Sequence, residues 1–186
     1  LLSKPKLQHI KYPHTSMTIP VANMLDMDAL QHANNHLFTL GFARKTGLPI
    51  PSLPIRHSAL CFQINPTNHD FYVVGRQSPF AMSIGNLDLT TKVSNEKEHV
   101  FGGYEFNAML TAAQFSTDDI THMSNKADAL INKPQLCNMA ESNCYSSAMV
   151  MMASGVELLT TPDRTSSFDS IASMLSLISK VSDDHF

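Results

Sequence analysis

Residues 141–155 constrain the fold more than any other stretch, because a polar start, Glu-Ser-Asn-Cys-Tyr-Ser-Ser, leads into the apolar run Ala-Met-Val-Met-Met-Ala-Ser-Gly. This pattern predicts an apolar helix that ends at Gly155, with Asn143 as a favourable N-cap directly before Cys144. A thiol in the first turn lies at the positive end of the helix dipole, which favours the thiolate. The polar neighbours indicate that this end of the helix meets solvent. Cys144 is therefore a candidate nucleophile, and the alternative is the small buried cysteine that is common in proteins.

The other two cysteines fit a structural role better. Cys61 lies inside an apolar strand-like run, and Cys137 lies in a loop. Three cysteines in 186 residues are also too few, and odd in number, for the disulfide framework of a secreted mini-protein. We therefore expect reduced thiols in a cytosolic setting, with one disulfide and one free thiol as the alternative.

The composition excludes several classes of function. A chain with 43% hydrophobic and 16% charged residues is typical of a soluble globular protein. A formal net charge of −3 without a basic cluster speaks against nucleic-acid binding. No apolar run approaches the ~20 residues that span a membrane. The chain begins at Leu1 without methionine, which we interpret as a fragment or processed form of a longer protein.

Periodicity and turn residues predict an α+β domain with helices packed on a small antiparallel sheet. Residues 1–46 are expected to form an N-terminal arm and helix, and residues 47–186 the α+β domain that carries any chemistry, the two together making one compact unit. Ser116 and Asp119 resemble a capping box with Asp in place of Glu. The segments predicted as helices are 24–41 (ending at Gly41), 105–115, 117–131, the stretch from Cys144 and 167–182. The segments predicted as strands are 55–64 and 71–77, which form a hairpin, and 80–89, with a surface loop at 94–103.

His57 opens the first strand of this hairpin and is the leading acid–base partner for a nucleophile. If Ile64 pairs with Phe71, His57 lies opposite Ser78, and a shift of one residue brings Gln77 there. Directly opposed side chains share a face and lie ~5 Å apart. Gln77 or Ser78 is therefore expected to orient the imidazole by a neutral hydrogen bond.

Asp70 is the acid nearest in sequence to the hairpin strands, but it lies at the wrong end. Seven or eight residues of strand at ~3.3 Å each separate it by more than ~20 Å from His57. A Cys-His-Asp triad through Asp70 is therefore disfavoured, and a Cys–His dyad with a neutral orienting residue is the expectation.

The order of a strand-opening histidine, a hairpin and an Asn-Cys helix start resembles the circularly permuted papain-like hydrolases. This group includes the permuted NlpC/P60 proteins, among them the PPPDE deSUMOylating peptidases and the lecithin:retinol acyltransferase-like enzymes. The matching segments are 56–60 (Arg-His-Ser-Ala-Leu), 71–75 (Phe-Tyr-Val-Val-Gly) and 142–144 (Ser-Asn-Cys). The resemblance implies a papain-like fold and a catalytic dyad of Cys144 and His57. Those families usually continue Asn-Cys-x-His-Phe, whereas this chain continues Tyr-Ser-Ser.

The same order also resembles the Ulp1-like and YopJ-like cysteine proteases and acetyltransferases of bacterial effectors. Those enzymes need an acid shortly after the second strand, and residues 75–78 (Gly-Arg-Gln-Ser) offer none. Together the resemblances imply a cysteine-nucleophile hydrolase or acyl transferase without a cofactor, acting on a peptide, isopeptide or thioester bond. A protein substrate is expected, such as a ubiquitin-like or host protein, as is a location in the cytoplasm or in a host cell after secretion.

Two alternatives use no nucleophile. One is a non-catalytic protein-interaction domain of the same fold, which the missing acid and the residues after Cys144 favour. The other is a metal-stabilised domain, in which His32 and His36 share one helix face and His9, His14 or His69 adds a ligand. Their spacing resembles His-Glu-x-x-His of zinc proteases, but Ala33 replaces the general-base glutamate. Two polar histidines on a solvent face are the simpler interpretation.

Overall fold

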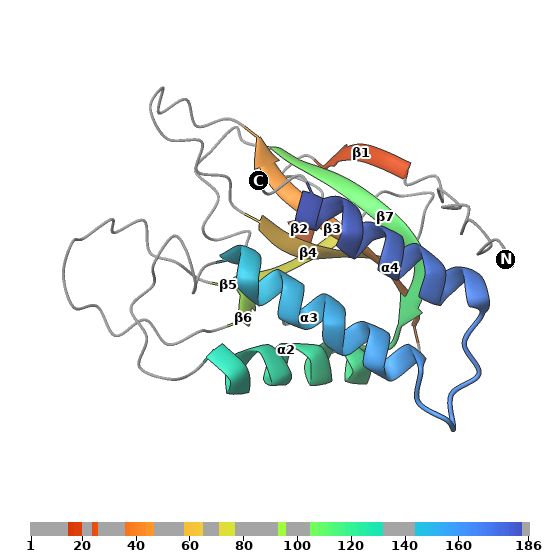
Figure 1. Ribbon diagram of the computed structural model, residues 1–186. Helices are drawn as coiled ribbons and strands as arrows, with labels where there is room; N and C mark the ends of the chain where they lie inside the picture. Colours follow the sequence, from red (N-terminus) through yellow and green to blue (C-terminus); the bar gives the residue numbers. More distant parts are fainter. Residues whose placement is uncertain are drawn as a thin grey trace, which may run out of the picture.

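The computed structural model describes residues 15–19, 24–25, 36–46, 58–64, 71–76, 93–95, 105–131 and 144–183. Within these ranges the chain is an α+β protein with helices packed on a largely antiparallel sheet, which confirms the α+β class predicted from periodicity. Three helices, α2 (Thr117–Ile131), α3 (Cys144–Leu159) and α4 (Phe168–Asp183), lie on one side of a single sheet. Figure 1 shows α3 and α4 running next to each other over the sheet, with α2 packed against α3.

The sheet has seven strands in the order β1-β7-β3-β4-β5-β2, and β6 also pairs with β5. Its centre, β7-β3-β4-β5, is antiparallel throughout, and β2 joins β5 in parallel. The strands of the N-terminal region therefore belong to the same sheet as the rest. The strand bounds are β1 Thr15–Ile19, β2 Met24–Leu25, β3 Phe38–Thr46, β4 Ser58–Gln63, β5 Phe71–Arg76, β6 Val93–Asn95 and β7 Glu105–Phe115.

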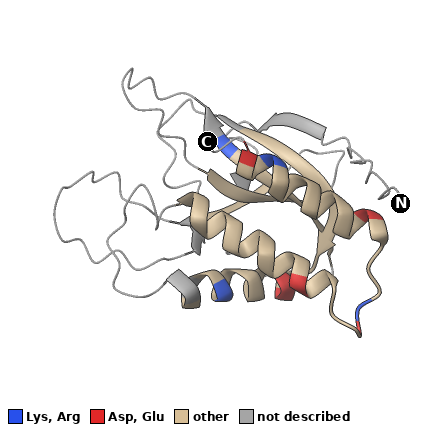
Figure 2. Ribbon diagram, viewed as in Figure 1, with Lys and Arg blue, Asp and Glu red and all other residues tan. Residues whose placement is uncertain are grey.

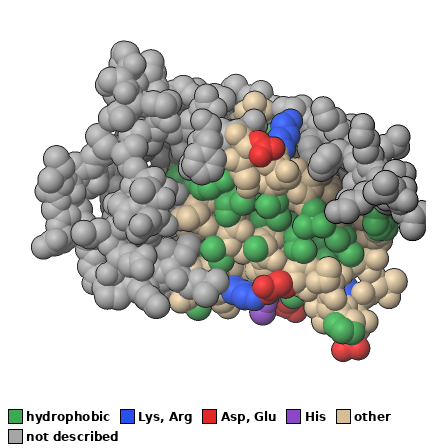
Figure 3. Space-filling view, in the orientation of Figure 1, with side chains coloured by type: hydrophobic (Ala, Val, Ile, Leu, Met, Phe, Trp, Pro, Cys, Tyr) green, Lys and Arg blue, Asp and Glu red, His purple; other side chains and the backbone are tan. Residues whose placement is uncertain are grey.

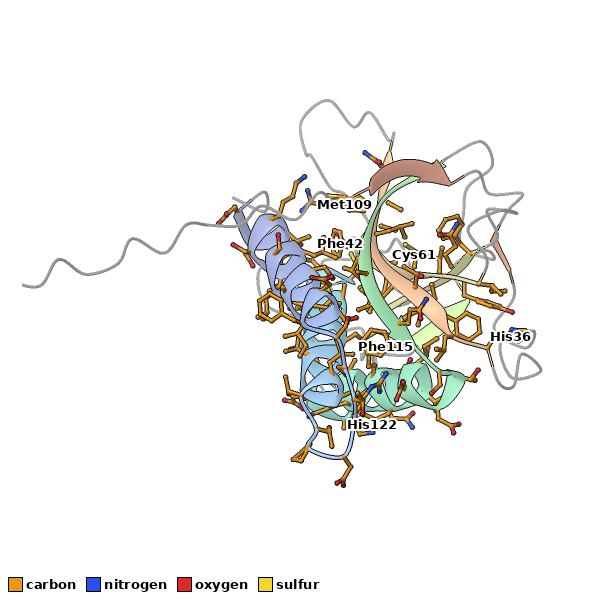
Figure 4. The ribbon with its side chains drawn as sticks, turned by 90° about the vertical axis from the view of Figure 1, so that its right-hand side faces the viewer. His36, Phe42, Cys61, Met109, Phe115 and His122 are labelled. Carbon is orange, nitrogen blue, oxygen red and sulfur yellow. The ribbon has the colours of Figure 1, made fainter. Side chains whose placement is uncertain are left out.

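The central strands are buried on both faces, which explains their continuous apolar runs. All six residues of β4 are buried. Alternate residues of β4, Leu60 and Phe62, join the core between sheet and helices, whereas Ala59 and Cys61 join a second cluster on the opposite face. Figure 4 shows this division, with Phe42 between the sheet and α4 and Cys61 on the far side.

The predicted hairpin is formed by β4 and β5, but its register differs by one residue. Gln63 pairs with Phe71 and Leu60 with Val74. Ile64, which was expected to pair with Phe71, instead lies in a bend after the ladder. The predicted strand at 80–89 lies outside the described residues. The first residues of the predicted loop at 94–103, Ser94 and Asn95, belong to β6.

The predicted helix at 24–41 is wrong where the structure describes it. Met24–Leu25 and Phe38–Thr46 are strands. Phe38, Leu40 and Phe42 alternate along β3 and face the helices. Three apolar residues with a period of two are too few to distinguish a strand from part of a helix in the sequence. Gly41 lies inside β3 and ends no helix. A Cβ atom there would lie 2.7 Å from Leu110 Cδ2, so the close strand packing requires glycine.

The predicted helix at 105–115 is also wrong, because this segment is strand β7. Its alanines, methionine and glutamine favour helix intrinsically, but β1 and β3 pair with the backbone of β7 on its two sides. The register with β3 shifts between Gly41, which pairs with Leu110, and Thr39, which pairs with Gln114. This bulge makes consecutive residues buried and so interrupts the alternation that marks a strand.

The helices predicted at 117–131, from Cys144 and at 167–182 are confirmed. The capping box before α2 is present: the Ser116 N–H donates to Asp119 Oδ2 at 2.9 Å, and the Asp119 N–H donates to Ser116 Oγ at 3.2 Å. Gly155 does not end its helix, since α3 continues to Leu159. A Cβ atom at Gly155 would lie 3.1 Å from Met123 Sδ, so the glycine allows α3 to pack closely against α2.

Candidate functional site

The candidate site lies where the first residue of α3 meets the first residue of β4. Cys144 begins α3, as predicted, and Ser58 begins β4. The Ser58 N–H donates a hydrogen bond to Cys144 Sγ at 3.4 Å, although 86 residues separate the two in sequence. The fold therefore holds the thiol against the edge of the central hairpin.

The position of Cys144 is fixed by the packing of α3. This helix lies over β4 and β5 and buries Ala148, Met151 and Met152 in the main core. Full burial of one methionine side chain stabilises a fold by roughly 1.5–3 kcal/mol. Rotating α3 to move its thiol would expose these side chains, so the start of the helix is held in place by its middle.

The surroundings of Cys144 favour a thiolate over a thiol. Its sulfur accepts the Ser58 N–H, and a hydrogen bond to the charged form stabilises that form. The sulfur also lies at the positive end of the α3 dipole, and the first turn of α3 carries no acidic side chain. Cys144 is half-buried, whereas Ser58 is buried.

Cys61 has the opposite surroundings. It is fully buried in the cluster on the far face of the sheet, and burial raises its pKa from 9.0 to about 12. Backbone hydrogen bonds from Cys61 and Gly41 oppose this shift only in part. The structural role expected for Cys61 agrees with this burial, and Cys137 lies outside the described residues. Between Cys61 and Cys144 the structure forms no disulfide.

The other residues predicted for the site, His57, Gln77 and Ser78, lie outside the described residues. His57 directly precedes Ser58 in the chain. The structure thus brings Cys144 to the residue that follows the predicted base, and it does not describe the imidazole itself.

Two features of the site were missed in the sequence. The backbone N–H of Ser58 is a partner of the sulfur, and the only available signal was its position after His57. Ser147, one helical turn after Cys144, is buried, and its hydroxyl finds no hydrogen-bond partner among the residues that the structure describes. Its place in the polar run Tyr-Ser-Ser predicted a solvent-exposed side chain, but the side chain of Ser147 is buried.

Of the two histidines in the metal hypothesis, the structure describes His36 and not His32. His36 is exposed and precedes β3 in a non-helical conformation, so a helical i, i+4 face is not formed at this residue. His32, His9, His14 and His69 lie outside the described residues. Among the residues with defined positions, no three histidine, cysteine, aspartate or glutamate side chains come together as metal ligands do.

Comparison with known proteins adds no relative, because no protein family, no curated protein and no solved structure matches this chain. Within the described part of the chain, every helix is too short or too polar to cross a bilayer.

Proposed function

We propose that this protein is a cysteine-nucleophile hydrolase or acyl transferase whose nucleophile is Cys144. The observation that carries the proposal is the hydrogen bond from the Ser58 N–H to Cys144 Sγ. It places the thiol at a helix N-terminus and beside the residue that follows a histidine. Nucleophile and base need this proximity, because proton transfer requires the two groups to come within hydrogen-bond reach.

His57 is the proposed base. Consecutive Cα atoms lie about 3.8 Å apart, so the backbone of His57 is one residue away from the contact with Cys144. The alternation of β4 turns Ala59 and Cys61 away from the helices, and a strand continued to His57 would turn this side chain away from Cys144 as well, so the proposal requires the chain to leave the strand geometry before Ser58, the first residue of β4. Gln77 and Ser78, the two residues predicted from the sequence, both stay candidates for orienting the imidazole by a neutral hydrogen bond.

The proposed reaction has two steps. The thiolate of Cys144 attacks the carbonyl carbon, a C–S bond forms, and the oxyanion accepts hydrogen bonds from backbone N–H groups at the start of α3. The imidazolium of His57 protonates the leaving amine or thiol as the tetrahedral intermediate collapses to a thioester. His57 then deprotonates the incoming water, or the acceptor in a transferase, which releases the acyl group and restores the enzyme.

The proposal of a papain-like fold rests on how one helix and one hairpin are arranged. An apolar helix with cysteine at its first residue packs across an antiparallel hairpin, and the cysteine contacts the start of the first hairpin strand. The chain departs from the permuted families after the cysteine, where Ser146 and Ser147 stand in place of their usual histidine and phenylalanine. This departure favours the second candidate, a non-catalytic protein-interaction domain that keeps the same framework.

The substrate class follows from the chemistry of a thiolate, which attacks peptide, isopeptide or thioester carbonyls. The resemblance to deSUMOylating and effector enzymes favours a protein substrate, such as a ubiquitin-like or host protein. It also favours action in the cytoplasm or, after secretion, in a host cell.

Alkylation by sub-stoichiometric iodoacetamide as a function of pH tests the proposal. We expect Cys144 to be labelled selectively, with a midpoint pH below the ordinary thiol value of about 8.5. His57→Ala should change this pH profile, whereas His122→Ala, which removes an exposed histidine on α2, should not. Two results together would exclude the dyad: labelling of Cys144 as slow as that of Cys61 and Cys137, and a pH profile of Cys144 labelling that is unchanged in His57→Ala. The non-catalytic interaction domain would then be the remaining candidate.

A further inference from the structure

Helix α4 presents apolar side chains to solvent on the face opposite to its buried side. Phe168 is 72% exposed and Leu175 is 52% exposed, although both are large and hydrophobic. Together with Ala172 and Ser179 they recur every three or four residues and so form one line along the helix, which we name the outer stripe. The buried residues of α4 lie on the other side of the helix: Ser173, Met174, Leu177 and Val181.

The outer stripe is free of charge and has one charge of each sign at its ends. From residue 170 to residue 179, α4 contains no charged residue. Asp169 precedes this span and Lys180 follows it, eleven residues later, which is about three turns, so both lie along the same flank of the stripe. Figure 2 shows the charged residues near the helix ends, and Figure 3 shows hydrophobic side chains gathered over α3 and α4 between them.

We propose that the outer stripe is the docking surface for a second copy of this chain, packed antiparallel across a two-fold axis at Leu175. A two-fold contact requires a surface that is complementary to itself. Leu175 lies six residues after Asp169 and five residues before Lys180. An antiparallel copy centred there brings Asp169 of each chain beside Lys180 of the other, so that two ion pairs flank an apolar centre.

The sizes of the side chains fit the same arrangement. Antiparallel pairing about Leu175 sets Phe168 against Ser182 of the second copy and Ala172 against its Ser179. Phe168 then meets a small side chain, Ala172 and Ser179 are both small, and the two Leu175 side chains meet on the axis itself, which lets the two helices approach closely. Asp183 comes beside the N-terminus of the second α4, where a carboxylate is stabilised by the helix dipole. A partner with an acidic or a basic surface would instead require charges of the opposite sign along the outer stripe, and residues 170–179 of α4 carry no charge.

The area of this contact predicts a weak dimer. A 16-residue helix is about 24 Å long and 10–12 Å wide, so one helix pair buries less than the roughly 800 Å² per partner of a standard interface. We therefore expect a reversible dimer with a dissociation constant in the micromolar range.

Sedimentation velocity of the full chain, from about 1 µM to several hundred µM, tests the proposal. Leu175→Lys sets two lysines on the two-fold axis and should weaken the dimer at least about tenfold. Leu37→Lys is the matched control, because Leu37 is 54% exposed but lies outside α4. Thermal unfolding of each variant confirms that it is folded.

The charges give an independent test. Asp169→Lys or Lys180→Asp alone sets like charges opposite each other and should weaken association by about threefold to tenfold, whereas the double variant should restore it. A wild-type chain that stays monomeric over the whole range, a dimer unaffected by Leu175→Lys, or a double variant no better than the single ones overturns the proposal. So does a monomer that binds anionic lipid vesicles through this helix.

Discussion

Thr111 lies in the bulge of β7, where the ladder between β3 and β7 is interrupted, and its hydroxyl links these two strands. Thr111 Oγ1 donates to the Leu40 carbonyl at 2.8 Å and accepts the Ala113 N–H at 3.1 Å, and both hydrogen bonds are buried. Thr111→Val keeps the shape of the side chain and removes both bonds. Because the bulge leaves no ladder partner for these groups, a carbonyl and an N–H remain buried without a partner.

The expected loss follows from these two groups. A buried polar group without a partner costs about 1–3 kcal/mol, so Thr111→Val should lower the free energy of unfolding by about 2–4 kcal/mol. At about 2–4 °C per kcal/mol for a chain of this size, the melting temperature should fall by roughly 5–15 °C.

Urea unfolding followed by circular dichroism measures this change as a lower midpoint at an unchanged m-value. Thr111→Ser keeps the hydroxyl and should lose less than half as much. Thr121→Val is the matched control on exposed helix surface, where the hydroxyl donates to the Thr117 carbonyl one turn back, and it should change stability by less than about 0.5 kcal/mol. Equal stability of the Thr111→Val, Thr121→Val and wild-type proteins would refute this account of the bulge.

Three further predictions concern the packing of the sheet and the loop before α4. Because burial raises the pKa of Cys61 to about 12, the folded state holds this proton more tightly than the unfolded state, so stability is full below pH 9 and declines as the pH rises towards 12. Cys61→Ala should flatten that decline in pH-dependent unfolding, and an unchanged slope would contradict the assignment. Gly41→Ala should destabilise by at least about 1–3 kcal/mol, since its Cβ atom would lie 2.8 Å from the Met109 carbonyl oxygen, and a soluble variant with wild-type stability would refute the close packing. Arg164→Ala removes a partly buried ion pair with Asp119 and should cost about 1 kcal/mol, whereas Arg164→Ala in an Asp119→Ala background should cost less in a double-mutant cycle.

Helix prediction succeeded where the signals were local. Ser116 and Asp119 cap α2 through contacts three residues apart, and α4 alternates buried and exposed positions with the helical period. Such patterns depend on neighbours in the chain, so they are visible in the sequence. The α+β class followed from these helices and from the hairpin of β4 and β5.

Strand prediction failed where pairing with distant segments decides the conformation. β7 is rich in helix-favouring residues, yet its backbone bonds to β1 and β3, which lie more than 50 residues away in the chain. The bulge at Thr111 further removes the alternation by which a strand is recognised. The one-residue error in the hairpin had a similar cause, because Ile64 is apolar and looks like a ladder residue but lies in the bend.

The candidate site combines both kinds of information. That Cys144 starts a helix is a local property, set by the polar run before an apolar segment, and the sequence predicts it. That its sulfur meets Ser58 depends on how α3 lies over β4, and the packing of Met151 and Met152 against the sheet decides this. The order of residues therefore indicates a nucleophile and a base, but only the tertiary contact between α3 and β4 gives a reason to test them as a pair. If His57→Ala leaves the alkylation of Cys144 unchanged, the hydrogen bond from Ser58 is a structural tie between helix and sheet, and the proposed chemistry falls while the fold stands.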